Sequence, residues 1–331
     1  MKPAKSILVI KLSALGDFVM AFPAFARIRA SHPDARITLL TTPPFETLAR
    51  VSPYFDGVDT DGRPAGPGEW LRLIGRLRRA RFDRVYDLQN NDRTNLIFQA
   101  LRPLPPAWSG TAAGAALPHR NPARAAMHAL ERHAQQLEHA GIWPDAPTRP
   151  LSAPPPDISW ILQRAQAKTR AGAAKPRPAA VLIPGSSAHR TEKRWPVESY
   201  GRLAARFEQE GFDVMVVGGL QEGELARGIQ RLAPRARDLT GRTDFAQIAA
   251  LGARAAVAVG NDTGPVHLIA AAGTPTIVLF SSASSPELSA PRGHVTVFQA
   301  PDLAEVSVDT VLAAALSLAA RPEAASGDQP G

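Results

Sequence analysis

The chain alternates between short apolar runs rich in β-branched residues and longer stretches in which apolar residues recur every three or four positions. The runs predict buried strands of parallel sheets, and the longer stretches predict amphipathic helices that cover them. Strands are expected at 5–11, 36–41, 84–88, 179–183, 213–217, 255–259 and 275–280. This order of elements predicts an α/β fold built from doubly wound sheets.

Helices are expected between and after these strands. They should begin at residues 17 and 93 and cover 44–51, 70–77, 122–140, 158–168, 197–210, 222–232, 245–252 and 304–319. Pro23 should kink or restart the helix that begins at Asp17, because proline lacks an N–H and clashes with the preceding turn. Gly141 should end the helix over 122–140.

Prolines crowd the segment between residues 144 and 178, where a sheet could not continue. A chain of 331 residues is also long for a single core. We therefore expect an N-terminal domain at 1–155, a connection at 156–178, a C-terminal domain at 179–320 and a disordered tail at 321–331. The simplest arrangement places two doubly wound domains face to face across a central cleft, which is lined by the carboxyl ends of their strands.

The formal net charge of +8 and the isoelectric point near 10.4 indicate an anionic partner. Arginines concentrate around the predicted helix at 70–77, and this helix face allows two interpretations. It is either an ordinary solvated surface or a surface for anionic lipid headgroups or a phosphorylated acceptor. Nucleic acid is not expected, because no zinc-finger or helix-turn-helix spacing is present. The arginines are Arg72, Arg76, Arg78, Arg79, Arg81 and Arg84.

Cysteine is absent, which excludes disulfides and thiolate metal sites and fits a reducing compartment. The first apolar run is too short for a signal peptide, and no uncharged apolar stretch reaches the roughly 18 residues of a membrane span. We therefore expect a soluble, cytoplasmic protein.

The segment 259–267 reads VGNDTGPVH and joins an apolar strand to a predicted helix. Pro265 suits the first helical turn, where free N–H groups bind anions at the carboxyl edge of a parallel sheet. The triplet Asp262-Thr263-Gly264 also occurs in aspartic proteases, but those enzymes need two such carboxylates in a β-rich framework. We reject that interpretation. His267 is expected to be a packed or capping histidine, since no metal-ligand cluster surrounds it.

Two further loops follow predicted strands. The first, 11–17, reads KLSALGD, and Asp17 could be a helix N-cap or a general base. The second, 184–190, reads PGSSAHR and precedes Lys193, so hydroxyls and a cation could bind phosphate, or the loop could be a plain surface turn. After a third strand, Glu222 and Glu224 could start a helix or contact a sugar hydroxyl.

These segments occur in an order that resembles glycosyltransferase family 9, the ADP-heptose:lipopolysaccharide heptosyltransferases. The likeness rests on ILVIKLSALGD at 7–17, KRWP at 193–196 and NDTGPVHL at 261–268, with looser matches at 87–90 and 128–132. It covers residues 5–319. The resemblance implies a GT-B fold with two Rossmann-like domains, the first for the acceptor and the second for the nucleotide sugar.

The resemblance also implies roles for individual residues. Asp17 would be the general base of an inverting transfer of a sugar, a heptose, from an ADP-sugar to the inner core of lipopolysaccharide. Metal ions and cofactors would not be required, and the protein would work at the cytoplasmic face of the inner membrane as a peripheral protein. The expected donor-binding residues are Ser186, Ser187, Lys193, Asp262, Thr263, Gly264 and His267. The expected acceptor-binding residues are Ser13, Gly16, Gln89, Arg93 and Arg120.

Two alternatives remain beside the transferase. A GT-B relative could use another nucleotide sugar or acceptor, or act as a nucleotide-sugar epimerase or hydrolase that needs no lipid acceptor. A nucleotide-binding scaffold without catalysis could dock at the membrane through its basic face, although such a scaffold would not need a carboxylate at Asp17.

Overall fold

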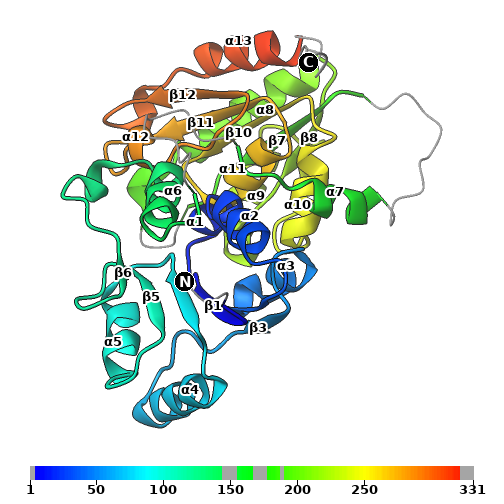
Figure 1. The fold of residues 1–331 in the computed structure, drawn as a ribbon. Coiled ribbons are helices and arrows are strands. Elements are labelled where there is room, and N and C mark those ends of the chain that lie inside the picture. The colour runs from blue at the N-terminus through cyan, green and yellow to red at the C-terminus, as the bar shows by residue number, and fades with distance from the viewer. Residues whose placement is uncertain (1–3, 144–154, 167–176, 187–189, 321–331) are drawn as a thin grey trace, which may run out of the picture. The chain divides into compact units, whose positions relative to one another are not determined.

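The structure is a computed structural model that describes residues 4–143, 155–166, 177–186 and 190–320 (Figure 1). The chain divides into two compact units, one that runs to Ile161 and includes Glu287–Ser289, and one that runs from Leu162 to Pro286 and continues from Ala290. The expected tail at 321–331 lies outside the described residues. That the two domains face each other across a cleft stays a prediction.

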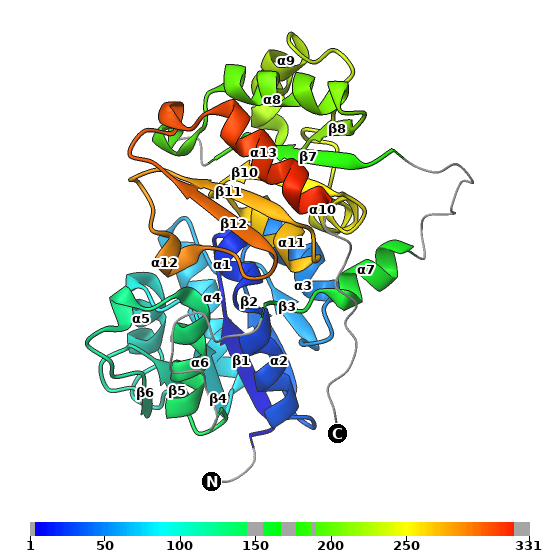
Figure 2. The same ribbon diagram turned by 90° about the horizontal axis from the view of Figure 1, so that it is seen from above.

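The first unit is built on a six-stranded sheet in which all neighbouring strands are parallel. The strand order is β3-β2-β1-β4-β5-β6, so the chain starts at the centre, moves to one edge and then returns to build the other half (Figure 2). The strands are β1 (Ser6–Ile10), β2 (Arg36–Leu40), β3 (Gly57–Asp59), β4 (Arg84–Asp87), β5 (Ala107–Gly110) and β6 (Leu117–Pro118).

Helices cover both faces of this sheet, which is why Leu8 and Val9 in neighbouring, opposite-facing positions of β1 are both fully buried. On one face, α4 (Pro67–Ala80) and α5 (Asp92–Ala100) share a core with Trp108 of β5. On the other face, α2 (Phe22–Ser31) packs against α6 (Ala129–His139) (Figure 2). The short helices are α1 (Leu15–Val19), η1 (Pro43–Phe45), α3 (Glu46–Val51) and η2 (Arg124–Ala126).

Aromatic side chains fill the space around α2. The ring centroid of Phe22 lies 5.5 Å from that of Trp160, and Tyr54 lies 6.0 Å from the same indole. Trp160 belongs to α7 (Ser159–Gln166), the helix that spans the junction of the two units. The helix expected at 158–168 therefore forms within the expected connection, and its tryptophan packs against aromatic side chains of the first unit.

The expected effect of Pro23 is confirmed. Helix α1 ends at Val19, and α2 restarts at Phe22 with Pro23 in its first turn. The restart occurs because a proline N–H is not needed in the first turn of a helix.

The single helix expected over 122–140 is wrong in its first part. Only a 3₁₀ turn forms at Arg124–Ala126, and α6 begins after His128, whose Nδ1 accepts a hydrogen bond from the Leu130 N–H at 3.2 Å. The imidazole therefore caps a new helix instead of continuing an old one. Gly141 follows α6 at φ 76°, a conformation that glycine adopts without strain.

The second unit repeats the architecture with a second parallel sheet, in the order β12-β11-β10-β7-β8-β9. Its strands are β7 (Ala179–Ile183), β8 (Asp213–Val216), β9 (Arg237–Asp238), β10 (Val257–Asn261), β11 (Thr276–Phe280) and β12 (Val295–Gln299). Its helices are η3 (Thr191–Lys193), α8 (Val197–Gln209), η4 (Leu220–Glu222), α9 (Gly223–Gln230), α10 (Phe245–Gly252), α11 (Gly264–Ala271), η5 (Leu303–Glu305) and α13 (Val308–Ala319). Helix α12 (Pro286–Ser289) belongs to the first unit from Glu287 on.

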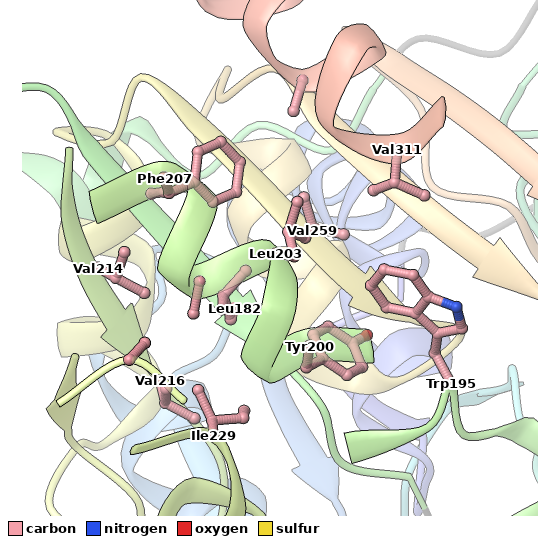
Figure 3. Close-up of a cluster of buried hydrophobic side chains, with 14 of the residues drawn as sticks. Leu182, Trp195, Tyr200, Leu203, Phe207, Val214, Val216, Ile229, Val259 and Val311 are labelled. Carbon is pink, nitrogen blue, oxygen red and sulfur yellow. The ribbon is translucent and has the colours of Figure 1, made fainter. Parts of the chain in front are cut away.

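The core of this unit lies between the sheet and helices α8 and α13. Figure 3 shows Phe207 and Leu203 of α8 over the strands, with Val311 of α13 beside them. Trp195 and Tyr200 stand next to each other at one end, with ring centroids 5.0 Å apart and an edge-to-face angle of 76°. This end of the core adjoins the loops of the candidate site.

The sequence pattern missed five strands and set a second helix start too early. Strands β3, β5, β6, β9 and β12 are short or lie toward the sheet edges, where apolar runs are weak. The helix expected from residue 304 begins at Val308, because Ser307 caps it through a hydrogen bond from the Thr310 N–H at 3.2 Å.

A methyl group at Gly260 should destabilise the second unit. The added Cβ would lie 2.5 Å from Cγ2 of Val266 and 2.8 Å from Cβ of Ile183, where no space exists. We expect Gly260→Ala to lower the free energy of unfolding by about 1–3 kcal/mol in chemical denaturation. The control is Gly75→Ala in α4, where a Cβ meets nothing within 4 Å and should be neutral or slightly stabilising. Equal stability of the two variants would contradict this packing.

Candidate functional site

The loop after β1 is held by the amide of Gln89, which follows β4. Its Oε1 accepts hydrogen bonds from the backbone N–H groups of Leu12 at 2.8 Å and Ser13 at 3.2 Å. Strands β1 and β4 are neighbours, so their carboxyl ends meet at one edge of the sheet. Gln89, expected to bind an acceptor, thus also shapes the loop that carries Ser13.

Asp17 is the third residue of α1 and half-buried. Its Oδ2 accepts a hydrogen bond from the Ala14 N–H at 3.3 Å. The N-cap position belongs to Ala14, so the interpretation of Asp17 as the N-cap is wrong. A carboxylate in the first helical turn is still favourable, because the helix N-terminus carries partial positive charge. One carboxylate oxygen is thereby fixed while the other is not used by the loop.

The interior beside this loop contains a buried lysine and a buried acid. Burial lowers the pKa of Lys11 to about 8, although nearby Asp17 raises it. The Nζ of Lys11 donates to the carbonyl of Leu88 at 3.2 Å. Burial also raises the pKa of Asp87 to about 6, against hydrogen bonds from the N–H groups of Asn90 and Gln89 that lower it.

A second amide ties α6 to the same edge of the sheet. Nε2 of Gln136 donates to the carbonyl of Asp87 at 2.9 Å, and its Oε1 accepts from Nδ2 of Asn90 at 2.7 Å. Asn90 has a φ of 50°, a left-handed conformation that asparagine tolerates better than most residues. This network fixes the position of α6 relative to the loop after β4.

The remaining expected acceptor residues lie around this edge with different exposure. Gly16 is buried in α1, Arg93 is half-buried near the start of α5, and Arg120 is exposed after β6. Arg63, which the sequence pattern does not single out, also lies at this edge, and its guanidinium donates to Oγ of Ser13. Arg63 precedes a proline in an irregular loop, and no periodic signal distinguishes it from other surface arginines.

In the second unit, one buried amide joins three segments. Oδ1 of Asn261 accepts from the Trp195 N–H at 3.0 Å and from the Tyr200 hydroxyl at 3.1 Å. Its Nδ2 donates to the carbonyl of Pro184 at 2.8 Å. The loop after β7, the start of α8 and the end of β10 are therefore locked together by the side chain of Asn261.

Lys193 and Asp262 are brought together at this edge, although 69 positions separate them. Nζ of Lys193 lies 2.7 Å from Oδ2 of Asp262, and their side chains are only 18% and 9% exposed. Helix α11 starts at the adjacent Gly264, with Thr263 as its N-cap. A cation, a carboxylate and a helix N-terminus thus share the carboxyl end of β10.

All the other expected donor residues except Ser187 lie within the described part of the chain. His267 is buried in the first turns of α11. The hydroxyl of Ser186 donates to the carbonyl of Arg190 at 2.8 Å and accepts from Nε of Arg194 at 3.0 Å, which closes the loop after β7. Ser187 lies outside the described residues.

Glu222, a weak candidate from sequence, lies over the carboxyl ends of two strands. A Cβ on Gly185 after β7 would come within 2.7 Å of its side chain, and one on Gly218 after β8 within 2.9 Å. The glycines therefore make room for this carboxylate. In doubly wound folds an acid near the end of the second strand reaches ribose hydroxyls.

The described residues contain neither a candidate membrane-spanning helix nor a candidate metal centre. None of the helices there combines the length and apolarity needed to cross a bilayer. No group of three histidine, aspartate or glutamate side chains in the same ranges is arranged to hold a metal ion.

Comparison with known proteins identifies the family. A family model described as glycosyltransferase family 9 (heptosyltransferase) matches residues 70–305, more than two thirds of the chain. The chain belongs to glycosyltransferase family 9. It is similar to lipopolysaccharide heptosyltransferase 2 of Escherichia coli K12, with 26% identity over 313 residues, 87% of this chain and 86% of that protein.

Solved structures show the fold. An E. coli ADP-heptose lipopolysaccharide heptosyltransferase II matches with a TM-score of 0.77 at 23% identity, covering 95% of this chain and 98% of that one. An E. coli heptosyltransferase solved with ADP matches with a TM-score of 0.72 at 20% identity, covering 95% and 99%. The expected GT-B fold, with two Rossmann-like domains, is confirmed.

A pH titration of stability should reveal the buried charge of Lys11. Its pKa falls from 10.5 to about 8, so the protonated form destabilises the folded state, and this penalty disappears as the pH rises between these values. The free energy of unfolding of the wild type relative to Lys11→Met should therefore increase from pH 8 to pH 10.5. Tyrosines titrate in both proteins and cancel in the difference. A flat or falling difference would show that Lys11 is not buried as a cation.

Proposed function

We propose that the protein is an inverting glycosyltransferase that moves a heptose from an ADP-sugar to a lipopolysaccharide inner-core acceptor. The observation that carries the proposal is that the family-matching segments all lie at carboxyl ends of parallel strands. Asp17 follows β1, Lys193 follows β7 and Asp262 follows β10. Ligands of doubly wound domains bind at such edges. The relatives named heptosyltransferase 2 supply the substrate class.

The second unit would bind the donor through its diphosphate. Lys193 has three donor hydrogens, and Asp262 engages one of them, so the others can reach phosphate oxygens. The N–H groups at Thr263 and Gly264 begin an eight-residue helix and favour negative charge. We assign Ser186, Ser187 and His267 to the same donor site, and Glu222 to the ribose hydroxyls.

Asp17 would act as the general base. It removes the proton of an acceptor hydroxyl, whose oxygen then forms a bond to the anomeric carbon while the bond from that carbon to the diphosphate oxygen breaks. The leaving diphosphate gains negative charge, so Lys193 and the start of α11 stabilise the transition state more than the ground state. This scheme uses no metal ion or cofactor. We assign acceptor contacts to Ser13, Gly16, Gln89, Arg93 and Arg120.

We also propose that the protein is cytoplasmic and attaches peripherally to the inner membrane through the outer face of α4. Leu71 on this helix is 76% exposed, and Arg72 and Arg79 are exposed beside it. Across the described ranges, no acidic side chain pairs with either arginine, whereas Arg76 of the same helix pairs with Asp59. Exposed leucine with unneutralised arginine complements an anionic lipid surface.

Transfer should be measured with a panel of ADP-, UDP- and GDP-sugars and truncated lipopolysaccharide acceptors, by release of nucleoside diphosphate. We expect ADP release that depends on the acceptor and persists with a chelator. Asp17→Asn keeps an oxygen for the Ala14 N–H but cannot accept the proton, so turnover should fall about 10²- to 10⁴-fold.

The control for this variant is Asp213→Asn, an exposed aspartate at the start of β8. Binding of ADP should be unchanged in both variants. Unaltered turnover of Asp17→Asn would remove Asp17 as the base. Release of free sugar or an isomer without any acceptor would replace the transferase by a hydrolase or epimerase.

Binding to vesicles tests the membrane proposal. Each arginine near an anionic surface contributes about 1 kcal/mol, so the double variant Arg72→Gln with Arg79→Gln should bind phosphatidylglycerol vesicles about 30-fold more weakly. The double variant Arg206→Gln with Arg254→Gln in the second unit removes the same charge and should bind like the wild type. Equal losses in both variants would point to net charge alone, and no loss would exclude this helix face.

A further inference from the structure

Strand β12 forms one margin of the second sheet, and part of its backbone faces outward (Figure 2). At one end, the carbonyl of His294 accepts a hydrogen bond from the Thr276 N–H of β11 at 2.8 Å. At the other end, the Ala300 N–H donates to the carbonyl of Phe280 at 3.1 Å. Alternate residues of a parallel strand bond to the same neighbour, so the even-numbered residues of β12 face β11. The backbone of Val297 therefore points away from the sheet.

The outward backbone groups of β12 are open. Across the ranges that the structure describes, no hydrogen bond reaches the N–H or the carbonyl of Val297 or Gln299. Both side chains are exposed, and that of Val297 is 37% exposed. Phe298, on the opposite face of the strand, packs against the core of the second unit. The strand is therefore held by its core face and its inner neighbour, while its outer edge can accept another strand.

The other three sheet edges in the described part of the chain carry features that prevent such pairing. Strand β3 has three residues and ends in Asp59, and β6 has two residues, of which one is Pro118. Strand β9 consists of two charged residues, Arg237 and Asp238. Short strands, proline and charge all protect sheet edges from further pairing. Strand β12 has five residues that read VTVFQ, and it lacks these protections.

The surroundings of β12 are uncharged, although the whole chain has a net charge of +8. No charged residue occurs from Val295 to Pro301. Helix α13, which packs on the strand next to β12, carries no charged residue after Asp309. Two copies of a basic chain repel each other, so they can approach most closely where charge is absent. An anionic partner would instead need basic side chains at this edge.

We propose that β12 pairs with β12 of a second copy of this chain, in antiparallel orientation, to form a symmetric dimer with one continuous sheet. Copies related by a two-fold axis present the same edge to each other, so outward N–H groups meet outward carbonyls. Val297, the middle residue, lies opposite the partner's Val297, and Val295 lies opposite the partner's Gln299. The Val295 N–H already donates to the carbonyl of Gly293, so Val295 takes part through its carbonyl alone.

The dimer does not depend on the proposed function. Antiparallel pairing directs the carboxyl ends of the two second-unit sheets to opposite ends of the joined sheet, and the residues assigned to donor binding all come from one chain. Dimerisation can therefore be measured without any substrate. The measurement still decides if no sugar is transferred to any acceptor.

Sedimentation velocity over about a 100-fold range of protein concentration tests the pairing. We expect the wild type to dimerise as the concentration rises. Val297→Pro removes an outward N–H but no hydrogen bond to β11, and an edge strand tolerates proline at such a position. Because the symmetry removes two intermolecular hydrogen bonds at once, the dissociation constant should rise about 10- to 100-fold. The control, Val297→Thr, keeps the N–H and the branched side chain and should dimerise like the wild type.

A second variant decides if the proline disturbs the strand. Val297→Lys keeps the backbone N–H and places two cations opposite each other in the dimer, so it should also dissociate. Thermal unfolding of each variant checks that the fold is intact. A wild type that stays monomeric over the whole concentration range would overturn the proposal, and so would dimerisation of Val297→Lys with the affinity of the wild type.

Cross-linking tests the register directly, because the chain contains no cysteine. In a hydrogen-bonded antiparallel pair, opposite Cα atoms lie about 5.5 Å apart, within the range of a disulfide. Val297→Cys should therefore form a covalent dimer on oxidation. The control, Gln299→Cys, lies on the same exposed face, but the proposed register separates its two copies by about 14 Å along the strands. Equal cross-linking of the two variants, or no cross-linking of Val297→Cys, would reject this pairing.

Discussion

The side chain of Asn261 is the interaction on which the candidate donor site depends. It is fully buried, and its amide supplies both hydrogen-bond acceptors and donors to segments that are distant in sequence. Lys193 stands two residues before Trp195, and Asp262 is the next residue after the amide. The short distance between the lysine and the aspartate is therefore a consequence of the neighbouring asparagine, because the strand ends alone would allow the loops several positions.

In the first unit, the side chains of two glutamines fix the segments at the sheet edge. Gln89 holds the loop after β1, and Gln136 holds α6 against the end of β4. A neutral amide suits this task because it both donates and accepts, and because its burial carries no charge penalty. The amides thereby fix the loop and the helix that lie behind the charged groups at the sheet edge.

The sequence pattern predicted what depends on local order and missed what depends on tertiary contacts. Strand β7 and helix α10 were placed correctly from a dense apolar run and from helical spacing. Helix α6 was drawn too long, because the capping of His128 onto Leu130 competes with helix continuation and leaves no periodic signal. Short strands such as β9 pair through the backbone at a sheet margin and need few apolar residues.

The same division holds for the site. The motif residues Asp17, Lys193 and Asp262 could be proposed from sequence, since each follows an apolar strand. The structural role of Asn261 could not, because an asparagine inside a motif does not reveal that three segments converge on it. Lys11 belongs to a recognised motif segment, but the burial that lowers its pKa appears only in the fold.

The ion pair between Lys193 and Asp262 has a consequence for selectivity. The carboxylate of Asp262 lies 2.7 Å from the ammonium of Lys193 and screens its charge. A small free anion would therefore have to compete with Asp262 for this lysine. Abundant cellular orthophosphate or sulfate would gain little by entering. A ligand with several anchoring points, such as the proposed nucleotide donor, would instead share the ammonium with the aspartate, so the ion pair would favour large nucleotides over simple salts.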